Sequence, residues 1–232
     1  HHQRVERMEQ GKSGHRGRLR QRVLQMGADS LQDYELIELL LHYSIPRKDT
    51  KPLAKHLLEK FKSIEYLIHA SPDQVLAIDG IGEATVVQLQ MIRRLRQRMI
   101  ETEIASSNVL SSWQAVIDYC RSKIGFEDQE NFAVLLLNSL NELIIFKILA
   151  KGTVNKVTAY PREIARLALE NNAVSVVLVH KHPSGNTTPS KQDIEMTRNI
   201  RKVLMGIDVT LHDHLIISPG GETSFKTLGL LE

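Results

Sequence analysis

Apolar residues in the first part of the chain recur at a spacing of three or four. Between residues 18 and 103 the spacing is clearest at Leu31, Tyr34, Leu36, Ile37, Leu40 and Leu41. Such a repeat places apolar side chains on one face of an α-helix. Turn residues interrupt it at Gly27, at 44–47, at 71–72 and at 80–82. The pattern predicts an all-α domain over 3–104, made of about five short helices.

The pattern changes after a polar stretch at residues 105–108. Strand-like apolar runs follow at 132–137, 143–149, 174–179 and 209–217. Between these runs, one helix is expected to open at Pro161 and another near Ser190. We therefore predict a separate, mixed α/β domain over 108–232.

The composition is that of a soluble globular protein, with 42% hydrophobic and 25% charged residues. No apolar run reaches the roughly 18 to 20 residues that cross a bilayer, and the N-terminus lacks a signal-peptide core. We expect a cytoplasmic protein with no membrane partner, and a homo-oligomer stays open. His1 and His2 resemble the remains of a purification tag. The single cysteine, Cys120, excludes an internal disulfide and any zinc site with two thiolates.

The net charge of +3 is small but unevenly distributed. Residues 1–105 hold 17 Lys and Arg against 14 Asp and Glu, whereas residues 106–232 hold 13 of each. Positive charge gathers at Arg16, Arg18, Arg20 and Arg22, and again at Arg93, Arg94, Arg96 and Arg98. These clusters are either a surface for a polyanion such as DNA or simply solvated helix faces.

Two histidines follow the third apolar run. His180 and His182 stand at i and i+2, so the two-residue period of a strand sends both imidazoles to one side of the sheet. After Pro183-Ser184-Gly185 the chain turns through a polar loop to Ser190, and Asp193 follows one helical turn later. The side chains of His180, His182 and Asp193 are therefore candidates for one metal site.

Two neutral imidazoles and one carboxylate match the three protein ligands of a catalytic zinc site, whose fourth position holds water. Zinc lowers the pKa of that water to about 7, and a nearby carboxylate can then accept its proton. Structural explanations compete with this one. Ser190 and Asp193 also fit a helix capping box, and a His-x-His pair on a strand is often plain polar surface.

The spacing His-x-His, seven residues, Ser-x-x-Asp resembles the JAMM (MPN+) metalloprotease motif and, more narrowly, the RadC family. Supporting matches are GTVNKV at 152–157, PREI at 161–164, HPSG at 182–185 and DHLII at 213–217. Lys181 stands where family members more often carry Asn, and it is expected to point away from the metal. The resemblance implies a helical N-terminal domain followed by an α/β domain of the JAMM/MPN+ (cytidine-deaminase-like) class.

The resemblance also implies roles for individual residues. By resemblance, Zn²⁺ is bound by His180, His182 and Asp193, Glu130 is the general base, and Ser190 orients water or stabilises an oxyanion. The residues alone do not distinguish Glu130 from Glu127 or Asp128. Asp213 and His214 either lie beside the site or are polar residues at a strand edge.

A second motif, at residues 78–83, resembles the hairpin of a helix-hairpin-helix motif. There Gly80 and Gly82 would permit a tight turn, and the backbone N–H groups of the Gly80-Ile81-Gly82 turn would approach a DNA phosphate. The next helix adds Arg93 and Arg94, whereas Val86 stands where the motif usually has a small residue. A plain turn between helices is the alternative. The RadC resemblance favours sequence-independent DNA binding.

These observations predict a RadC-like, DNA-associated protein whose zinc domain hydrolyses an amide or isopeptide bond in a protein or peptide. A metal-dependent nuclease is one alternative. A non-enzymatic DNA-binding protein of repair or recombination, with a structural metal, is another. The ligand types also suit manganese or iron.

Overall fold

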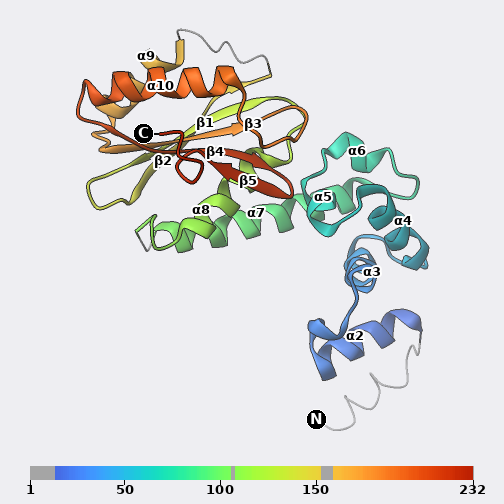
Figure 1. Ribbon diagram of the computed structural model, residues 1–232. Coiled ribbons are helices and arrows are strands. Elements are labelled where there is room, and N and C mark those ends of the chain that lie inside the picture. The colour runs from blue at the N-terminus through green and yellow to red at the C-terminus, as the bar shows by residue number, and fades with distance from the viewer. Residues whose placement is uncertain (1–13, 106–107, 153–158, 232) are drawn as a thin grey trace. The chain divides into compact units, whose positions relative to one another are not determined.

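The computed structural model describes residues 14–105, 108–152 and 159–231 (Figure 1). The chain forms two compact units, one up to Arg94 and the other from Leu95 onward. We placed the boundary at 105–108, whereas this division falls inside the long helix α7 (Glu83–Ala105). Of the GTVNKV match at 152–157, all but Gly152 lies outside the described residues.

The first unit is helical, as the apolar spacing predicted. Its elements are α2 (His15–Met26), the 3-10 helix η1 (Ala28–Ser30), α3 (Asp33–Ser44), α4 (Lys51–Phe61), α5 (Ile64–His69), α6 (Pro72–Leu76) and the first part of α7. Capping residues define where several of these helices begin. The Ser63 hydroxyl accepts the Tyr66 N–H at the start of α5, and Ser71 forms a capping box with Gln74 at the start of α6.

Apolar side chains from these helices form one core. Leu41, Leu57 and Leu67 are each 1% exposed or less, and they carry the helical spacing seen in the sequence. Ile81 and Val86 join the same core, on either side of the start of α7. The bulk of Val86 is therefore used in packing α7 against its neighbours.

The second unit is built on a five-stranded mixed sheet. Its strands are β1 (Asn131–Leu137), β2 (Leu143–Lys151), β3 (Ser175–Lys181), β4 (Thr210–Ser218) and β5 (Gly221–Ser224), in the order β2-β1-β3-β4-β5. β3 and β4 are parallel, and the other neighbouring pairs are antiparallel. The central strands β1 and β3 are buried along their whole length, which explains their unbroken apolar runs.

Helices cover both faces of this sheet (Figure 1). α9 (Ala159–Glu170) and α10 (Lys191–Met205) pack on one face, with Ile164, Leu178 and Ile200 in the core between the layers. The other face is covered by α8 (Trp113–Cys120), the π-helix η2 (Arg121–Gly125) and the end of α7. The predicted helices at Pro161 and Ser190 are thus present, whereas α8, η2 and β5 were not predicted.

A candidate metal centre

The two histidines of the motif are presented by the end of β3. His180 is fully buried, paired in register with Phe132 of β1 and with Ile216 of β4. His182 follows directly after the last residue of β3. Their ring centroids lie 4.7 Å apart with the planes nearly perpendicular. The strand period therefore brings both imidazoles to one side, as the sequence predicted.

Asp193 reaches this side from the first turn of α10. The Ser190 hydroxyl accepts the Asp193 N–H at 3.0 Å, and the Ser190 N–H donates to Asp193 Oδ2 at 2.9 Å, which is a complete capping box. The same carboxylate faces His182 Nε2 at 2.8 Å and His180 Nδ1 at 3.3 Å. Helix capping and assembly of the site are thus one arrangement, and not competing explanations.

Three side chains have the geometry of a metal-binding group. Among the described residues, the ligand atoms of His180, His182 and Asp193 lie within 4.8 Å of one another. His182 Nδ1 donates to the Asn186 carbonyl at 2.7 Å, so this nitrogen carries the hydrogen and Nε2 keeps its lone pair. The Asn186 contact therefore holds His182 in the tautomer that binds a metal through Nε2.

Glu130 joins the group from the residue that precedes β1. Its Oε1 lies 2.8 Å from His180 Nε2, although fifty positions separate the two residues in sequence. It is not part of the group of mutually close ligand atoms found among the described residues. Burial lowers the pKa of Lys181, and the negative charges of Asp128 and Glu127 act against this shift, so these two acids lie near Lys181. The structure thus separates Glu130 from the two acids that the sequence left as alternatives.

Lys181 lies between the two histidines in sequence. Its side chain is buried, and Nζ donates to the His182 carbonyl at 2.6 Å. Strand alternation directs the side chain of Lys181 to the opposite side of the sheet from that of His180. This agrees with the predicted orientation of Lys181, away from the metal group. Lys181 therefore supports the backbone of His182 and is not a ligand in this arrangement.

The electrostatics of the site fit a bound cation. Burial disfavours ionisation of Asp193, but the contacts of its carboxylate with the imidazoles of His180 and His182 and with the Ser190 N–H outweigh burial and hold the pKa of Asp193 far below its usual range. A neutral imidazole has a single N–H, yet both nitrogens of His180 face carboxylate oxygens. An additional positive charge at this point would satisfy both carboxylates, and two imidazoles with a carboxylate are a donor set that zinc accepts.

A buried polar network lies behind the metal group. The Thr197 hydroxyl donates to the Asp193 carbonyl at 2.6 Å and lies 2.7 Å from His214 Nδ1, so the imidazole of His214 must donate to the hydroxyl oxygen. His214 is fully buried and stacks on Phe225 and, at 6.0 Å between centroids, on His180. Burial lowers the pKa of His214 to about 3, which keeps the ring neutral.

Asp213 holds in place the segment that carries Phe225, the residue stacked on His214. Its carboxylate accepts the N–H groups of His214 and Lys226 and the hydroxyl of Ser224. Asp213 and His214 are both buried, so they are not the strand-edge polar residues that the sequence left possible.

The residues predicted to bind nucleic acid lie in the first unit. Gly80 has a φ of +90°, as a tight turn before α7 requires, whereas Gly82 has no positive φ. The Ile81 N–H donates to the Ile78 carbonyl at 3.2 Å, so it is not available to a phosphate. Arg93 and Arg94 follow on α7. The turn exists, but the predicted helix-hairpin-helix type and its DNA contacts stay predictions.

Comparison with known proteins agrees with this architecture. Residues 110–230 match the family described as the RadC-like JAB domain, and residues 13–87 match the UPF0758 N-terminal family. A UPF0758 protein of Rhodobacter capsulatus is 44% identical over 213 residues, covering 92% of this chain and all of the relative. A UPF0758 protein of Ruegeria pomeroyi is 44% identical over 217 residues, covering 94% of this chain and 97% of the relative.

The helical first unit, the mixed sheet and the His-His-Asp group define a protein with a C-terminal JAB/MPN domain. The chain belongs to the UPF0758 family, whose C-terminal part is the RadC-like JAB domain. JAB domains are often hydrolytic metalloproteases. Within the described part of the chain, no helix has both the length and the apolar character needed to cross a membrane.

Proposed function

We propose that this protein is a zinc-dependent hydrolase that cleaves an amide or isopeptide bond in a protein or peptide. The observation that carries the proposal is the group of buried His180, half-buried His182 and buried Asp193, with the Glu130 carboxylate hydrogen-bonded to its edge. A carboxylate beside an open metal site is the arrangement that water activation needs.

Each residue of the site has a distinct part in this proposal. His180, His182 and Asp193 would hold the zinc, which when bound would lower the pKa of water and polarise the substrate carbonyl. Glu130 accepts a proton from the attacking water and returns it to the leaving nitrogen. The Ser190 oxygen accepts the Asp193 N–H, so its hydroxyl hydrogen can donate to the substrate oxygen as negative charge develops.

The test compares metal content with hydrolysis in matched variants. Glu130→Gln should keep about one equivalent of zinc and lower hydrolysis about 10²- to 10⁴-fold, because only proton transfer is removed. His182→Ala should lose zinc and hydrolysis together. Glu127→Gln, a neighbouring acid near Lys181, serves as the control and should change neither.

The substrates in this test are isopeptide-linked peptides and branched DNA, each with purified protein and added zinc. Cleavage of the peptides alone supports the proposal, whereas cleavage of the DNA alone would assign the site to a nuclease. Loss of zinc in Glu130→Gln would make this residue a ligand. Zinc retention in His182→Ala would refute the site itself.

We also propose that the first unit binds DNA without sequence preference. Support comes from the Gly80 turn with its positive φ, the open space around Gly82 and the arginines of α7. A Cβ at Gly82 would meet no atom of the protein within 4 Å, so Gly82→Val should fold normally while blocking close approach of a phosphate.

Fluorescence anisotropy with single-stranded and duplex oligonucleotides at several salt concentrations would measure this binding. We expect affinity to fall with salt and to fall further in Gly82→Val and in the Arg93→Ala, Arg94→Ala double variant. Far-UV circular dichroism checks that each variant is folded. Unchanged affinity in both variants would place the DNA surface elsewhere.

A further inference from the structure

A cavity lies in the JAB domain, away from the metal group. It has a volume of about 580 Å³. Its walls come from the end of α10, from residues 208–212 at the start of β4, and from the C-terminal segment around Lys226, Gly229 and Leu231. In β4, Leu211 lines this cavity, whereas Ile216 is the residue paired with the ligand His180. Five residues of strand correspond to roughly 16 Å, so the two places are distinct.

The base of the cavity is apolar. Val209 and Leu211 are buried in the core beneath it, and Met205 of α10 exposes much of its side chain at its edge. A cavity of this size with an apolar base is in the range that small ligands occupy. The exposed Met205 side chain is flexible and can adapt to an apolar ligand.

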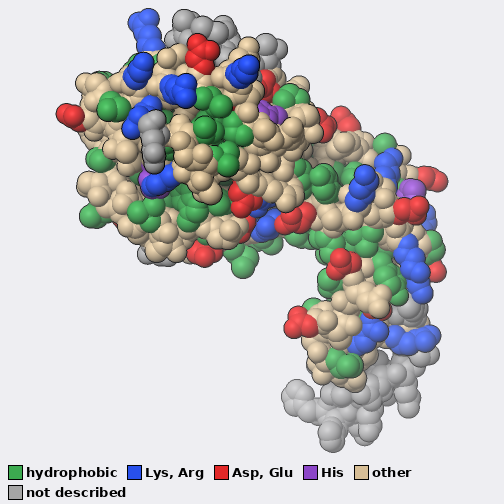
Figure 2. Space-filling model, in the orientation of Figure 1, with side chains coloured by type: hydrophobic (Ala, Val, Ile, Leu, Met, Phe, Trp, Pro, Cys, Tyr) green, Lys and Arg blue, Asp and Glu red, His purple; other side chains and the backbone are tan. Residues whose placement is uncertain are grey.

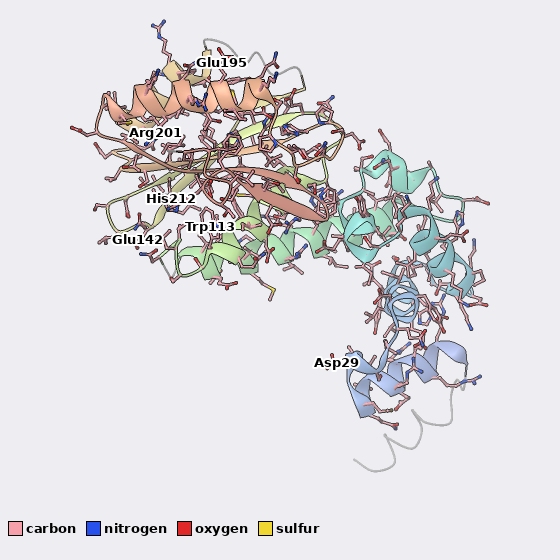
Figure 3. All side chains as sticks on the ribbon, in the orientation of Figure 1. Asp29, Trp113, Glu142, Glu195, Arg201 and His212 are labelled. Atoms are coloured by element: carbon pink, nitrogen blue, oxygen red, sulfur yellow. The ribbon has the colours of Figure 1, made fainter. Side chains whose placement is uncertain are left out.

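The rim of the cavity carries a surplus of positive charge. Arg201 and Lys226 line it from different elements, and Asp208 is the one carboxylate among its described lining residues. Figure 3 shows Arg201 on α10 and His212 on β4, and Figure 2 shows the lysine and arginine side chains on the face of this domain that carries α10. The imidazole of His212 packs edge-on against Trp113 at 5.6 Å.

Lys226 is close enough to His212 to affect its ionisation. Burial lowers the pKa of His212, and the positive charge of Lys226 lowers it further, although Asp213 opposes both. The positive charge of the Lys226 ammonium therefore influences groups that line the cavity as well as the surrounding solvent. An anion placed beside Lys226 would be attracted by both Lys226 and Arg201.

The strand edge in the cavity offers directional polar groups as well. β5 pairs with β4 only from Leu215 to Ser218, so β5 does not cover the first residues of β4. His212 is an extra residue in the ladder, because Leu211 pairs with Val176 and Asp213 with Val177. The Thr210 N–H is directed the other way, to the Val174 carbonyl. The backbone polar groups of Leu211 therefore face away from β3, toward the edge that β5 leaves unpaired among the described residues.

We propose that this cavity binds a small amphipathic anion, namely a carboxylic acid whose apolar part packs on Val209, Leu211 and Met205. The carboxylate lies between Arg201 and Lys226, and the uncovered edge of β4 supplies further hydrogen bonds. This site is independent of the hydrolase proposed above, and it requires no metal.

Titration of the full chain with octanoate, followed by ¹H–¹⁵N NMR, tests the proposal. Octanoate should shift the amide signals of residues 209–212 and 226 in a saturable way. Acetate has the charge without the apolar part, and octylammonium has the apolar part with the opposite charge, so both should bind at least about tenfold more weakly. Equal binding of octylammonium would overturn the proposal, because charge would then play no part.

Matched variants locate the site. Arg201→Gln and Lys226→Gln should each weaken octanoate binding about tenfold, because each removes a charge-assisted contact. Arg198→Gln is the control, since this arginine lies on the same helix and does not line the cavity. Unchanged binding in both test variants would refute the site. His182→Ala should bind octanoate normally, so the outcome is separate from that of the hydrolase proposal.

Discussion

His180 is a fully buried imidazole that contacts residues from three separate parts of the sequence. Strand periodicity was enough to predict that His180 and His182 share a side, and local spacing was enough to bring Ser190 and Asp193 into one helical turn. The contact of His180 with Glu130 spans fifty residues. It depends on the pairing of β1 with β3, which no local pattern reveals, so only the family resemblance pointed to Glu130.

Thr197 is a residue that the sequence did not single out. The structure places its hydroxyl between the Asp193 carbonyl and His214 Nδ1. Thr197→Val should lower the free energy of unfolding by about 1–3 kcal/mol, because the buried Nδ1–H of His214 would lose its acceptor. Denaturant unfolding measures the loss, and ¹⁵N NMR of the imidazole reports the tautomer of His214.

Thr197→Ser is the matched control for this prediction. It keeps the hydroxyl, so the Nδ1–H tautomer should persist and only the loss of one methyl group, about 1 kcal/mol, should remain. If the serine and valine variants were equally stable with the same tautomer, the hydroxyl would have no part in fixing His214.

At the scale of elements, long amphipathic or fully apolar segments were predictable and short polar ones were not. β1 and β3 were visible as unbroken apolar runs because both faces of each strand are covered. β5 has the sequence Gly-Glu-Thr-Ser, without an apolar residue, and it exists because it pairs with the end of β4. Tertiary pairing thus decided its conformation, and sequence pattern could not.

The packing of α2 on α3 includes an ion pair between Arg22 and Glu35. The hydrogen bond from Arg22, helped by the Gln32 N–H, holds the pKa of Glu35 below its ordinary value of 4.5. A carboxyl whose pKa is lowered on folding contributes stability above its unfolded pKa, and this contribution is lost as the pH falls below about 4.5. Both groups are partly exposed, so the contribution should be less than about 1 kcal/mol.

Arg22→Gln should therefore raise the pKa of Glu35 toward its ordinary value and flatten the pH dependence of unfolding below pH 4.5. A ¹³C NMR titration of Glu35 measures the first effect, and urea unfolding at pH 7 and pH 3.5 measures the second. Arg18→Gln changes an exposed arginine on the same helix and should leave the Glu35 titration unchanged. An unchanged Glu35 titration in Arg22→Gln would show that the ion pair does not form in solution.

At the scale of the whole molecule, the change from helical to strand-like spacing of apolar residues was enough to predict two domains of different structural class, one all-α and one mixed α/β. The position of the division was harder to predict. Helix α7 runs without interruption from Glu83 to Ala105, and the units divide after Arg94, while Ile104 packs in the core of the second unit. The arginines around that point lie within a continuous helix, and no turn residue interrupts it there, so the sequence directed us to the end of the helix.

Separate cores lead to a prediction about metal removal. The first unit has its own core around Leu41 and Leu57, and the second has cores on both faces of its sheet. A ligand that binds only the folded second unit stabilises that unit by about 2.7 kcal/mol at a hundredfold excess over its dissociation constant. Added zinc should therefore raise the unfolding midpoint of the second unit, and a chelator should reverse the shift.

The chain's single tryptophan, Trp113, lies in the second unit, so its fluorescence follows unfolding there. Far-UV circular dichroism follows both units, because the described secondary structure of the first unit is all helical. Zinc should raise the midpoint of the unfolding transition that tryptophan fluorescence follows. The circular dichroism transition that reports unfolding of the first unit should stay in place. His182→Ala should remove the shift, because one of the three proposed ligands is lost, whereas Lys202→Gln changes an exposed residue of α10 and should retain it. A zinc shift that survives in His182→Ala would mean that the stabilising ion binds outside the His-His-Asp group.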